Sequence, residues 1–147
     1  MDNTQIRMLK LAQEGYTCSQ IIILLGLEVR GETNPDLVRA MGGLAYGCGS
    51  GRGTCGTLSA GCCLLALYAG KGDPLETQSE RLALMLQELN DWFSAHTGRG
   101  GGDISCNAIV GEDGPAASRQ RCGAIVAETF AKVMEILAAN GIDPMGG

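Results

Sequence analysis

Cysteine is the residue through which this sequence could perform chemistry. Four of its seven cysteines, together with eight glycines, lie between residues 41 and 63, ahead of an apolar run that begins at Leu64. A thiolate is a strong nucleophile and a soft metal ligand, and glycine, which has no Cβ, lets the backbone approach a bound group closely. The segment therefore predicts a thiol or metal site. The alternative is a loop leading into a core helix whose cysteines are small buried residues.

Four cysteines lie near the predicted starts of helices. Cys18 follows Thr17, Cys55 follows Thr54, Cys106 comes three residues after Asp103, and Cys122 comes four residues after Ser118. The free N–H groups and the positive end of the dipole at a helix start stabilise a thiolate over a thiol. We therefore expect the pKa values of these thiols to be lowered, and their reactivity and metal affinity to be raised.

Spacing restricts the possible pairs of cysteines. Cys55 and Cys62 lie on one predicted helix, and seven residues of helix rise about 10 Å, whereas a disulfide needs Cα atoms within about 7 Å. Adjacent helical residues point about 100° apart, so at least one of Cys62 and Cys63 is expected to face the core. A partner for Cys55 should therefore come from another element: Cys18, Cys106, Cys122 or, across the loop, Cys48.

Several familiar motifs are missing or lack their context. The sequence has no CxxC, CxxCH or ferredoxin spacing, which argues against a thioredoxin site, a zinc ribbon and covalently bound haem. Gly51, Gly53 and Gly56 match a dinucleotide fingerprint, but no strand is predicted before them. These glycines and Arg52, the cation within the loop, stay candidates for cofactor binding. His96 lies near a predicted helix end, where a dipole partner is expected rather than a metal ligand.

Helical periodicity covers most of the chain and positions these residues. No segment alternates with the period of a strand, so the sequence predicts one all-α domain over residues 1–147. We expect a helical bundle of about six or seven helices, with a glycine-rich loop before the central helix. The expected helices cover residues 3–13, 17–31, 34–45 and 54–70, one that starts at Asp73-Pro74, a short turn over 104–110 and a last helix from Ser118 to Gly141; residues 98–103 form a break.

Composition narrows the class of protein. The chain has 147 residues and a net charge of −5, with Lys and Arg scattered, so it carries no basic footprint for nucleic acid. The longest apolar run, Ile21 to Leu25, is far too short to span a membrane, and the N-terminal residues lack a signal pattern. We expect a soluble cytoplasmic protein. Its thiols would stay reduced there, and an odd number of cysteines favours metal-binding or catalytic roles over a disulfide framework.

One set of motifs extends over most of the chain, from about residue 14 to residue 137. Its members are Cys18-Ser19-Gln20, the stretch from Met41-Gly42-Gly43 to Arg52, Cys55-Gly56, Cys106 and Cys122. Their order and spacing resemble the family of redox-active proteins named for a C, GCAxxG, C, C motif, whose members are small and helical. After Cys55-Gly56 the family pattern favours Ala and a later Gly, whereas this chain has Thr57 and Ala60. The resemblance implies redox chemistry without naming a substrate.

The leading hypothesis is a redox or metal-binding protein in which Cys18, Cys55, Cys106 and Cys122 converge on one site. In one version these thiolates, with Cys48, hold an iron–sulfur cluster or another soft metal. In the other, two cysteines cycle between dithiol and disulfide as a thiol-based oxidoreductase. Four close thiolates need a cation or protons to balance their charge. The metal hypothesis is therefore favoured if all four cysteines meet, and the thiol-exchange hypothesis is favoured if only two of them meet.

Two further classes stay open. One is a helical interaction or scaffold module with incidental cysteines, and the other is a structural zinc site without redox activity. The redox hypothesis implies a partner protein that the sequence does not identify. Nucleic acid and membrane are not expected as partners, because the chain lacks a basic footprint and an apolar run long enough to span a bilayer. A homodimer is also expected, because an interface would shelter an exposed glycine loop.

Overall fold

The computed structural model describes residues 2–97, 102–112 and 114–146. These residues form helices and turns, with one isolated β-bridge between Thr54 and Ser105. The prediction of an all-α single domain is thus confirmed. The helices are α1 (Asn3–Gln13), α2 (Cys18–Arg30), α3 (Pro35–Met41), the 3-10 turn η1 (Gly42–Leu44), α4 (Ala45–Cys48), α5 (Gly56–Ala69), α6 (Leu82–Thr97), α7 (Cys106–Val110) and α8 (Pro115–Ala139).

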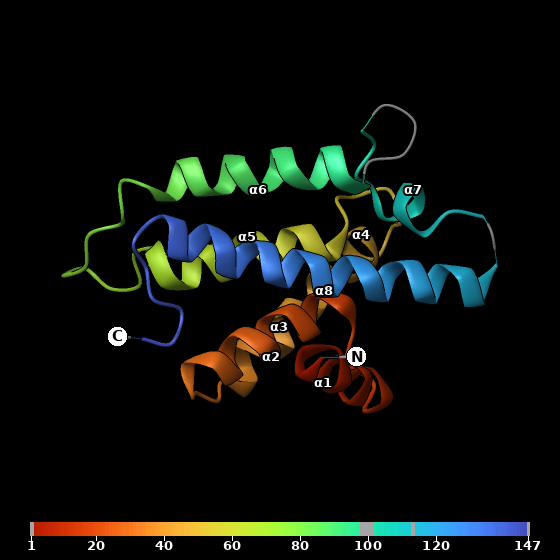
Figure 1. Cartoon of the computed structure of the whole chain (residues 1–147), viewed down its shortest axis with the longest axis horizontal. Coiled ribbons are helices and arrows are strands. Elements are labelled where there is room, and N and C mark those ends of the chain that lie inside the picture. Colours follow the sequence, from red (N-terminus) through yellow and green to blue (C-terminus); the bar gives the residue numbers. More distant parts are fainter. Residues whose placement is uncertain (1, 98–101, 113, 147) are drawn as a thin grey trace.

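Helix α5 forms the centre of the bundle and packs against α2, α6 and α8. Its apolar side chains extend around the helix, and Leu58, Leu64 and Leu65 are fully buried. Figure 1 shows α6 and α8 running alongside α5, with α1, α2 and α3 below them in that view. The contact with α2 is close, because a Cβ at Gly26 would lie 2.4 Å from a methyl carbon of Leu64.

Local caps set three of the helix starts. The backbone N–H of Thr17 donates to the Gln20 side chain at 3.1 Å at the start of α2. Asn34 accepts from the N–H of Leu37 at 3.1 Å, ahead of Pro35 in α3. Ser105, the N-cap of α7, accepts from the N–H of Ala108 at 3.2 Å. Each contact satisfies an N–H or orders a first turn, which is why these boundaries lie where expected.

Two predicted helix starts are wrong. The helix expected from Asp73-Pro74 begins at Leu82. Asp73 does accept from the N–H groups of Leu75 and Glu76, but it caps a single turn that does not propagate. The last helix begins at Pro115 rather than Ser118, and the Ser118 hydroxyl instead donates to the carbonyl oxygen of Val110 at 3.0 Å. Within the break predicted at 98–103, residues 98–101 lie outside the described part of the chain.

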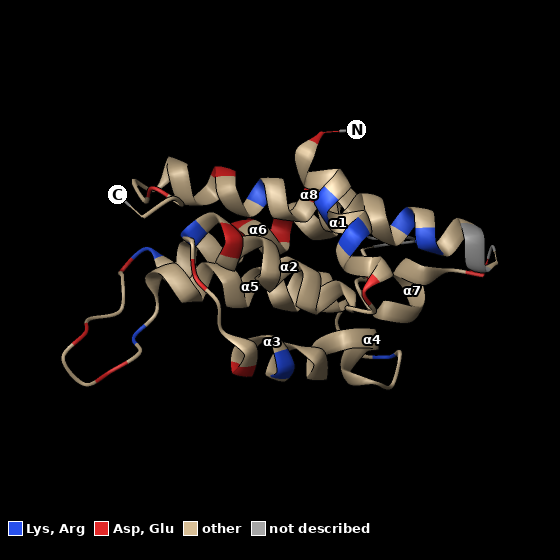
Figure 2. Cartoon of the chain, turned by 90° about the horizontal axis from the view of Figure 1, so that it is seen from below, with Lys and Arg blue, Asp and Glu red and all other residues tan. Residues whose placement is uncertain are grey.

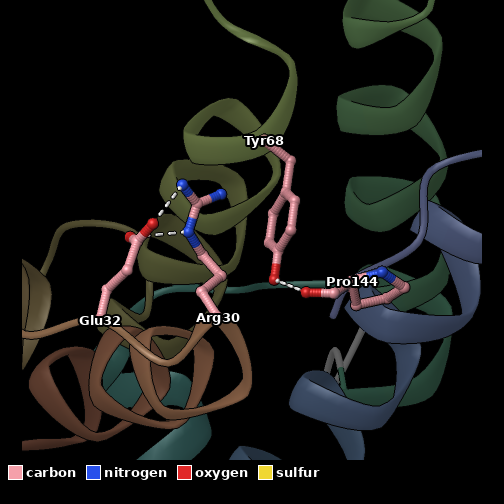
Figure 3. Close-up of polar contacts among 4 residues, drawn as sticks. All are labelled: Arg30, Glu32, Tyr68 and Pro144. Carbon is pink, nitrogen blue, oxygen red and sulfur yellow. Dashed lines mark hydrogen bonds and ion pairs between the residues drawn. The ribbon is translucent and has the colours of Figure 1, made fainter. Parts of the chain in front are cut away.

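A polar cluster holds the C-terminal segment against the ends of α2 and α5. The Arg30 guanidinium makes an ion pair with Glu32 and lies 4.8 Å from the centre of the Tyr68 ring, a cation–π contact. The Tyr68 hydroxyl donates to the carbonyl oxygen of Pro144 at 2.6 Å (Figure 3). These contacts connect three segments that are distant in sequence.

Charge is dispersed over the surface. Figure 2 shows acidic and basic residues intermixed on several helices and on the loop between α5 and α6. Within the described residues, no helix combines the length and the apolar character needed to cross a membrane.

Candidate thiol site

The four cysteines of the predicted site line a single cavity of about 710 Å³. Cys18 is the first residue of α2, Cys55 the N-cap of α5, Cys106 the first residue of α7, and Cys122 lies within α8. Figure 1 shows α4 and α7 at the end of the bundle where α8 begins. Each of the seven cysteines, all within the described residues, is a free thiol.

Backbone pairing between the glycine-rich segment and the start of α7 aligns Cys55 with Cys106. The N–H of Cys55 donates to the carbonyl oxygen of Ile104 at 2.8 Å, and the N–H of Cys106 donates to that of Gly53 at 2.9 Å. These bonds flank the antiparallel bridge between Thr54 and Ser105. Cys55 and Cys106 each follow directly on one of the bridged residues, so the bridge holds the two cysteines on adjacent segments.

Glycine is required where this pairing brings the chain close. The N–H of Asn107 donates to the carbonyl oxygen of Gly51 at 2.8 Å. A Cβ at Gly51 would lie 2.3 Å from the Asn107 side-chain oxygen, and one at Gly53 would lie 2.5 Å from the carbonyl oxygen of Gly47. A larger residue at Gly51 would displace the Asn107 side chain, and one at Gly53 would press on the Gly47 backbone and shift the segment that leads to Cys55.

A left-handed turn precedes the pairing. Tyr46, Gly47, Cys48 and Gly49 have φ angles of 58°, 61°, 57° and 83°, and the N–H of Gly49 donates to the carbonyl oxygen of Ala45 at 2.9 Å. For a residue other than glycine this conformation costs about 1–2 kcal/mol. The turn places Tyr46 on the cavity wall and leaves Cys48 exposed outside it.

The first turn of α5 packs against the sulfur of Cys18. A Cβ at Gly56 would lie 3.2 Å from Cys18 Sγ. The Thr57 side chain and the N–H of Ser19 both hydrogen-bond to the Cys18 thiol and act to lower its pKa. Thr57 is 2% exposed, so its hydroxyl lies inside the protein beside the Cys18 thiol.

Burial raises the thiol pKa values, contrary to the expectation from helix starts. Desolvation is the largest cause of the raised pKa of Cys18, of Cys106 and of Cys122, and for Cys122 it raises the pKa to about 11. Repulsion from Cys55 adds to each shift. Cys122 also lies seven residues beyond Pro115, past the first turn of α8 where N–H groups are free. The expectation of lowered pKa values is therefore wrong for these three thiols.

The remaining wall of the cavity is mainly apolar. Met8, Ile21, Ile109, Ile125 and Val126 are buried residues that line it. Leu9 and Tyr46 line it while 49% and 63% exposed, and Arg119 and Gln120 are exposed lining residues. The exposed residues mark the side on which the cavity opens to solvent.

The structure separates some predicted site residues from the cavity. Of the residues proposed for cofactor binding, Gly56 lines the cavity, whereas Gly51, Arg52 and Gly53 are not among its lining residues. Gly51 and Gly53 instead take part in the pairing with α7, and the N–H of Arg52 donates to the Ser50 hydroxyl at 3.1 Å.

The three additional cysteines also lie outside the cavity lining. Cys48 and Cys63 are exposed, and Cys62 accepts a hydrogen bond from the Asn90 side chain at 3.6 Å. In the described ranges, no three His, Cys, Asp or Glu side chains are grouped so that they could hold a metal ion. Metal binding by Cys18, Cys48, Cys55, Cys106 and Cys122 stays a prediction.

Sequence reasoning missed two residues of the site, Tyr46 and Thr57. Tyr46 stands next to Gly47 in a run of glycines, which is a local signal for a left-handed turn. Thr57 comes two residues after Cys55 and departs from the family pattern. A hydroxyl in the first turn of a helix that starts at a cysteine could have been noted as a hydrogen-bond donor to a neighbouring thiol.

The fold and the site define a class: a small helical protein whose thiols, contributed by four separate helices, share one cavity. Comparison with family models agrees, because residues 16–136 match the model described as "Putative redox-active protein (C_GCAxxG_C_C)". The match covers most of the chain, so the chain belongs to this family. No curated protein and no solved structure matches it.

Proposed function

We propose that this chain is a thiol oxidoreductase that cycles between a dithiol and a disulfide, with Cys55 as the central thiol. The observation that carries the proposal is the single cavity shared by Cys18, Cys55, Cys106 and Cys122. Membership in a family described as redox-active supports the same class of chemistry.

Cys55 is proposed as the central thiol because it neighbours each of the others. Repulsion from Cys55 contributes to the raised pKa of Cys18, of Cys106 and of Cys122, and it is the largest charge contribution for all three. Cys55 is also the N-cap of a 14-residue helix, whose first N–H groups have no partner within the helix. Cys55 therefore lies beside these N–H groups, on the wall of the cavity that the other three cysteines also line.

Cys106 is the proposed partner of Cys55. The bridge between Thr54 and Ser105 holds these two cysteines on adjacent segments, and a disulfide requires Cα atoms within about 7 Å. A small movement of the segment that contains Gly49, Gly51 and Gly53 would bring the two Cα atoms within that range. Glycine permits such a movement because its backbone has few steric limits.

The reaction can be written for a disulfide substrate carried by a redox partner. The Cys55 thiolate attacks one sulfur of that disulfide, forms a mixed disulfide and releases the first thiolate of the partner. The Cys106 thiolate then attacks the Cys55 sulfur, so that the Cys55–Cys106 bond forms and the second thiolate leaves. The two leaving thiolates take up the protons that Cys55 and Cys106 gave up, and two electrons pass to the partner.

The test is a map of thiols on the full chain, prepared reduced and without oxygen. Treatment with oxidised glutathione should remove two free thiols, and peptide mass mapping should recover Cys55 linked to Cys106. Cys63→Ser is the matched control, because Cys63 is exposed outside the cavity, and it should leave the pair unchanged. Retention of all thiols, or a bridge confined to Cys62 and Cys63, would contradict the proposal.

A soft metal or an iron–sulfur cluster is a second candidate, supported by the four thiols that line one cavity; these thiols would have to move together on binding, because the described structure does not group three of them closely enough to hold a metal ion. The ligands would be Cys18, Cys55, Cys106 and Cys122, and the bound group would supply one-electron transfer. Its test is metal analysis with a visible spectrum on protein purified without oxygen. Stoichiometric iron that is lost in Cys55→Ser would favour this candidate over dithiol cycling.

A further inference from the structure

The cavity has the size and lining of a small-molecule site. Its volume of about 710 Å³ lies within the range of about 300–1,000 Å³ that is typical of such sites. Ile21, Ile109, Ile125 and Val126 contribute buried apolar wall beside the thiols. The charged residue on the lining, Arg119, is exposed. The cavity interior would therefore bind an uncharged, apolar molecule.

Tyr46 adds a second observation. It is one of two tyrosines on the cavity lining, with Tyr16, and it is 63% exposed at the open side. Its φ of 58° and ψ of 36° lie in the left-handed region, beside Gly47 and Gly49, where glycine avoids the strain. An aromatic residue held in a strained conformation at the edge of a cavity suggests a role in binding.

We propose that the cavity binds a small, uncharged quinone, stacked on Tyr46 and reduced by the thiols. The proposal rests on the dithiol cycle described above, with a quinone in place of the partner disulfide as the acceptor of two electrons and two protons. A quinone meets this need and is also apolar and planar, so it matches both the lining and the exposed aromatic ring. Tyr46 is then a substrate-binding residue, and Cys55 and Cys106 are the thiols that react.

The Cys55 thiolate adds to a ring carbon of the quinone and forms a carbon–sulfur bond. The electron pair of the ring double bond is displaced onto a carbonyl oxygen of the quinone, and that oxygen takes up a proton. The Cys106 thiolate then attacks the Cys55 sulfur, so that the disulfide forms and the carbon–sulfur bond breaks. The electron pair of the broken carbon–sulfur bond moves to the second carbonyl oxygen, which takes up the second proton. The products are one hydroquinone and one Cys55–Cys106 disulfide.

Binding is tested separately from chemistry. Duroquinone, a fully methyl-substituted benzoquinone, would be titrated by equilibrium dialysis into the full chain carrying Cys55→Ser and Cys106→Ser. We expect saturable binding of one molecule per chain. Tyr46→Ala should weaken that binding by about tenfold, a loss in keeping with one aromatic contact, whereas Tyr46→Phe should retain it. Leu84→Ala, at a residue 68% exposed on α6 and not among the cavity-lining residues, is the control and should change nothing.

Failure of quinone binding and failure of quinone reduction give different results. Non-saturable uptake of duroquinone, or equal binding by Tyr46→Ala and the parent, would overturn the quinone site. If the double serine variant fails to fold by circular dichroism, the Tyr46 series is measured in the reduced parent chain, with the yield of hydroquinone as readout. One hydroquinone per chain with loss of two thiols is expected there. Binding without any reduction would overturn the quinone as electron acceptor, whereas the thiol map after oxidised glutathione tests the dithiol cycle itself, so the two failures are distinguishable.

Discussion

Gly56 lies against the sulfur of Cys18 at the point where α5 begins. A Cβ at this position would stand 3.2 Å from Cys18 Sγ and 2.7 Å from the carbonyl oxygen of Leu44. The second of these contacts is with backbone, which has little freedom to move away. The absence of a side chain at Gly56 therefore sets how closely α2 and the segment before α4 approach α5, and it keeps the Cys18 thiol on the cavity wall.

We therefore expect Gly56→Ala to destabilise the protein and displace Cys18. Overpacking of this kind costs about 1–3 kcal/mol, which would be measured as a loss in the free energy of unfolding by urea. Gly43→Ala is the matched control, because a Cβ at Gly43 meets no atom within 4 Å. A Gly56→Ala variant as stable as Gly43→Ala would show that the contact is relieved at no cost.

The fold could be predicted from the sequence where local residues decide it. Thr17 with Gln20, and Asn34 with Leu37, satisfy or order the first turn of their helices through residues only three positions apart. Asp73 carries the same local signal, but it caps an isolated turn. Nothing close in sequence distinguishes such a turn from a helix start, because continuation depends on burial of the following face, and Leu75 is 96% exposed.

The site was predictable in part for the same reason. The motif cysteines stood out by order and spacing, and all four line one cavity. The pKa directions were not predictable, because the burial of Cys122 comes from the packing of distant segments and outweighs the dipole of a nearby helix start. Tyr46 was missed because its left-handed backbone accompanies a contact between Gly47 and Gly53, which forms only in the folded chain.

The strained backbone of Tyr46 leads to a second prediction. Tyr46→Gly should raise the free energy of unfolding by up to about 1 kcal/mol, because the left-handed strain outweighs the entropy that glycine adds to the unfolded chain. Tyr46→Ala keeps the strain, so it should give no comparable gain. Thermal and urea unfolding of both variants would measure the difference. A Tyr46→Gly variant that is less stable than the parent would mean that contacts of the ring outweigh the strain.

Cys122 should make stability depend on pH in the alkaline range. Its pKa in the folded chain is about 11, above the ordinary value of 9.0, so the folded state holds the proton over this interval while the unfolded state loses it. The contribution of Cys122 to the free energy of unfolding is therefore fully present below pH 9.0 and is lost as the pH rises to about 11. Unfolding of the parent and of Cys122→Ala would be compared across this interval. The parent should lose more stability, and parallel curves would contradict the raised pKa.

Thr57 should control the reactivity of Cys18. Its side chain hydrogen-bonds to the Cys18 thiol and acts to lower the pKa of that thiol against the larger effect of burial. Thr57→Val keeps the shape of the buried side chain but removes the hydroxyl, so the Cys18 pKa should rise and its alkylation by iodoacetamide at mildly alkaline pH should slow several-fold. Thr57→Ser retains the hydroxyl and should react nearly as the parent does. Mass spectrometry of Cys18 and Cys106 peptides would provide the rates, with Cys106 as internal reference because no Thr57 contact contributes to its pKa. Equal slowing at both thiols would indicate a general change in the cavity, whereas selective slowing at Cys18 would assign the effect to the Thr57 hydroxyl.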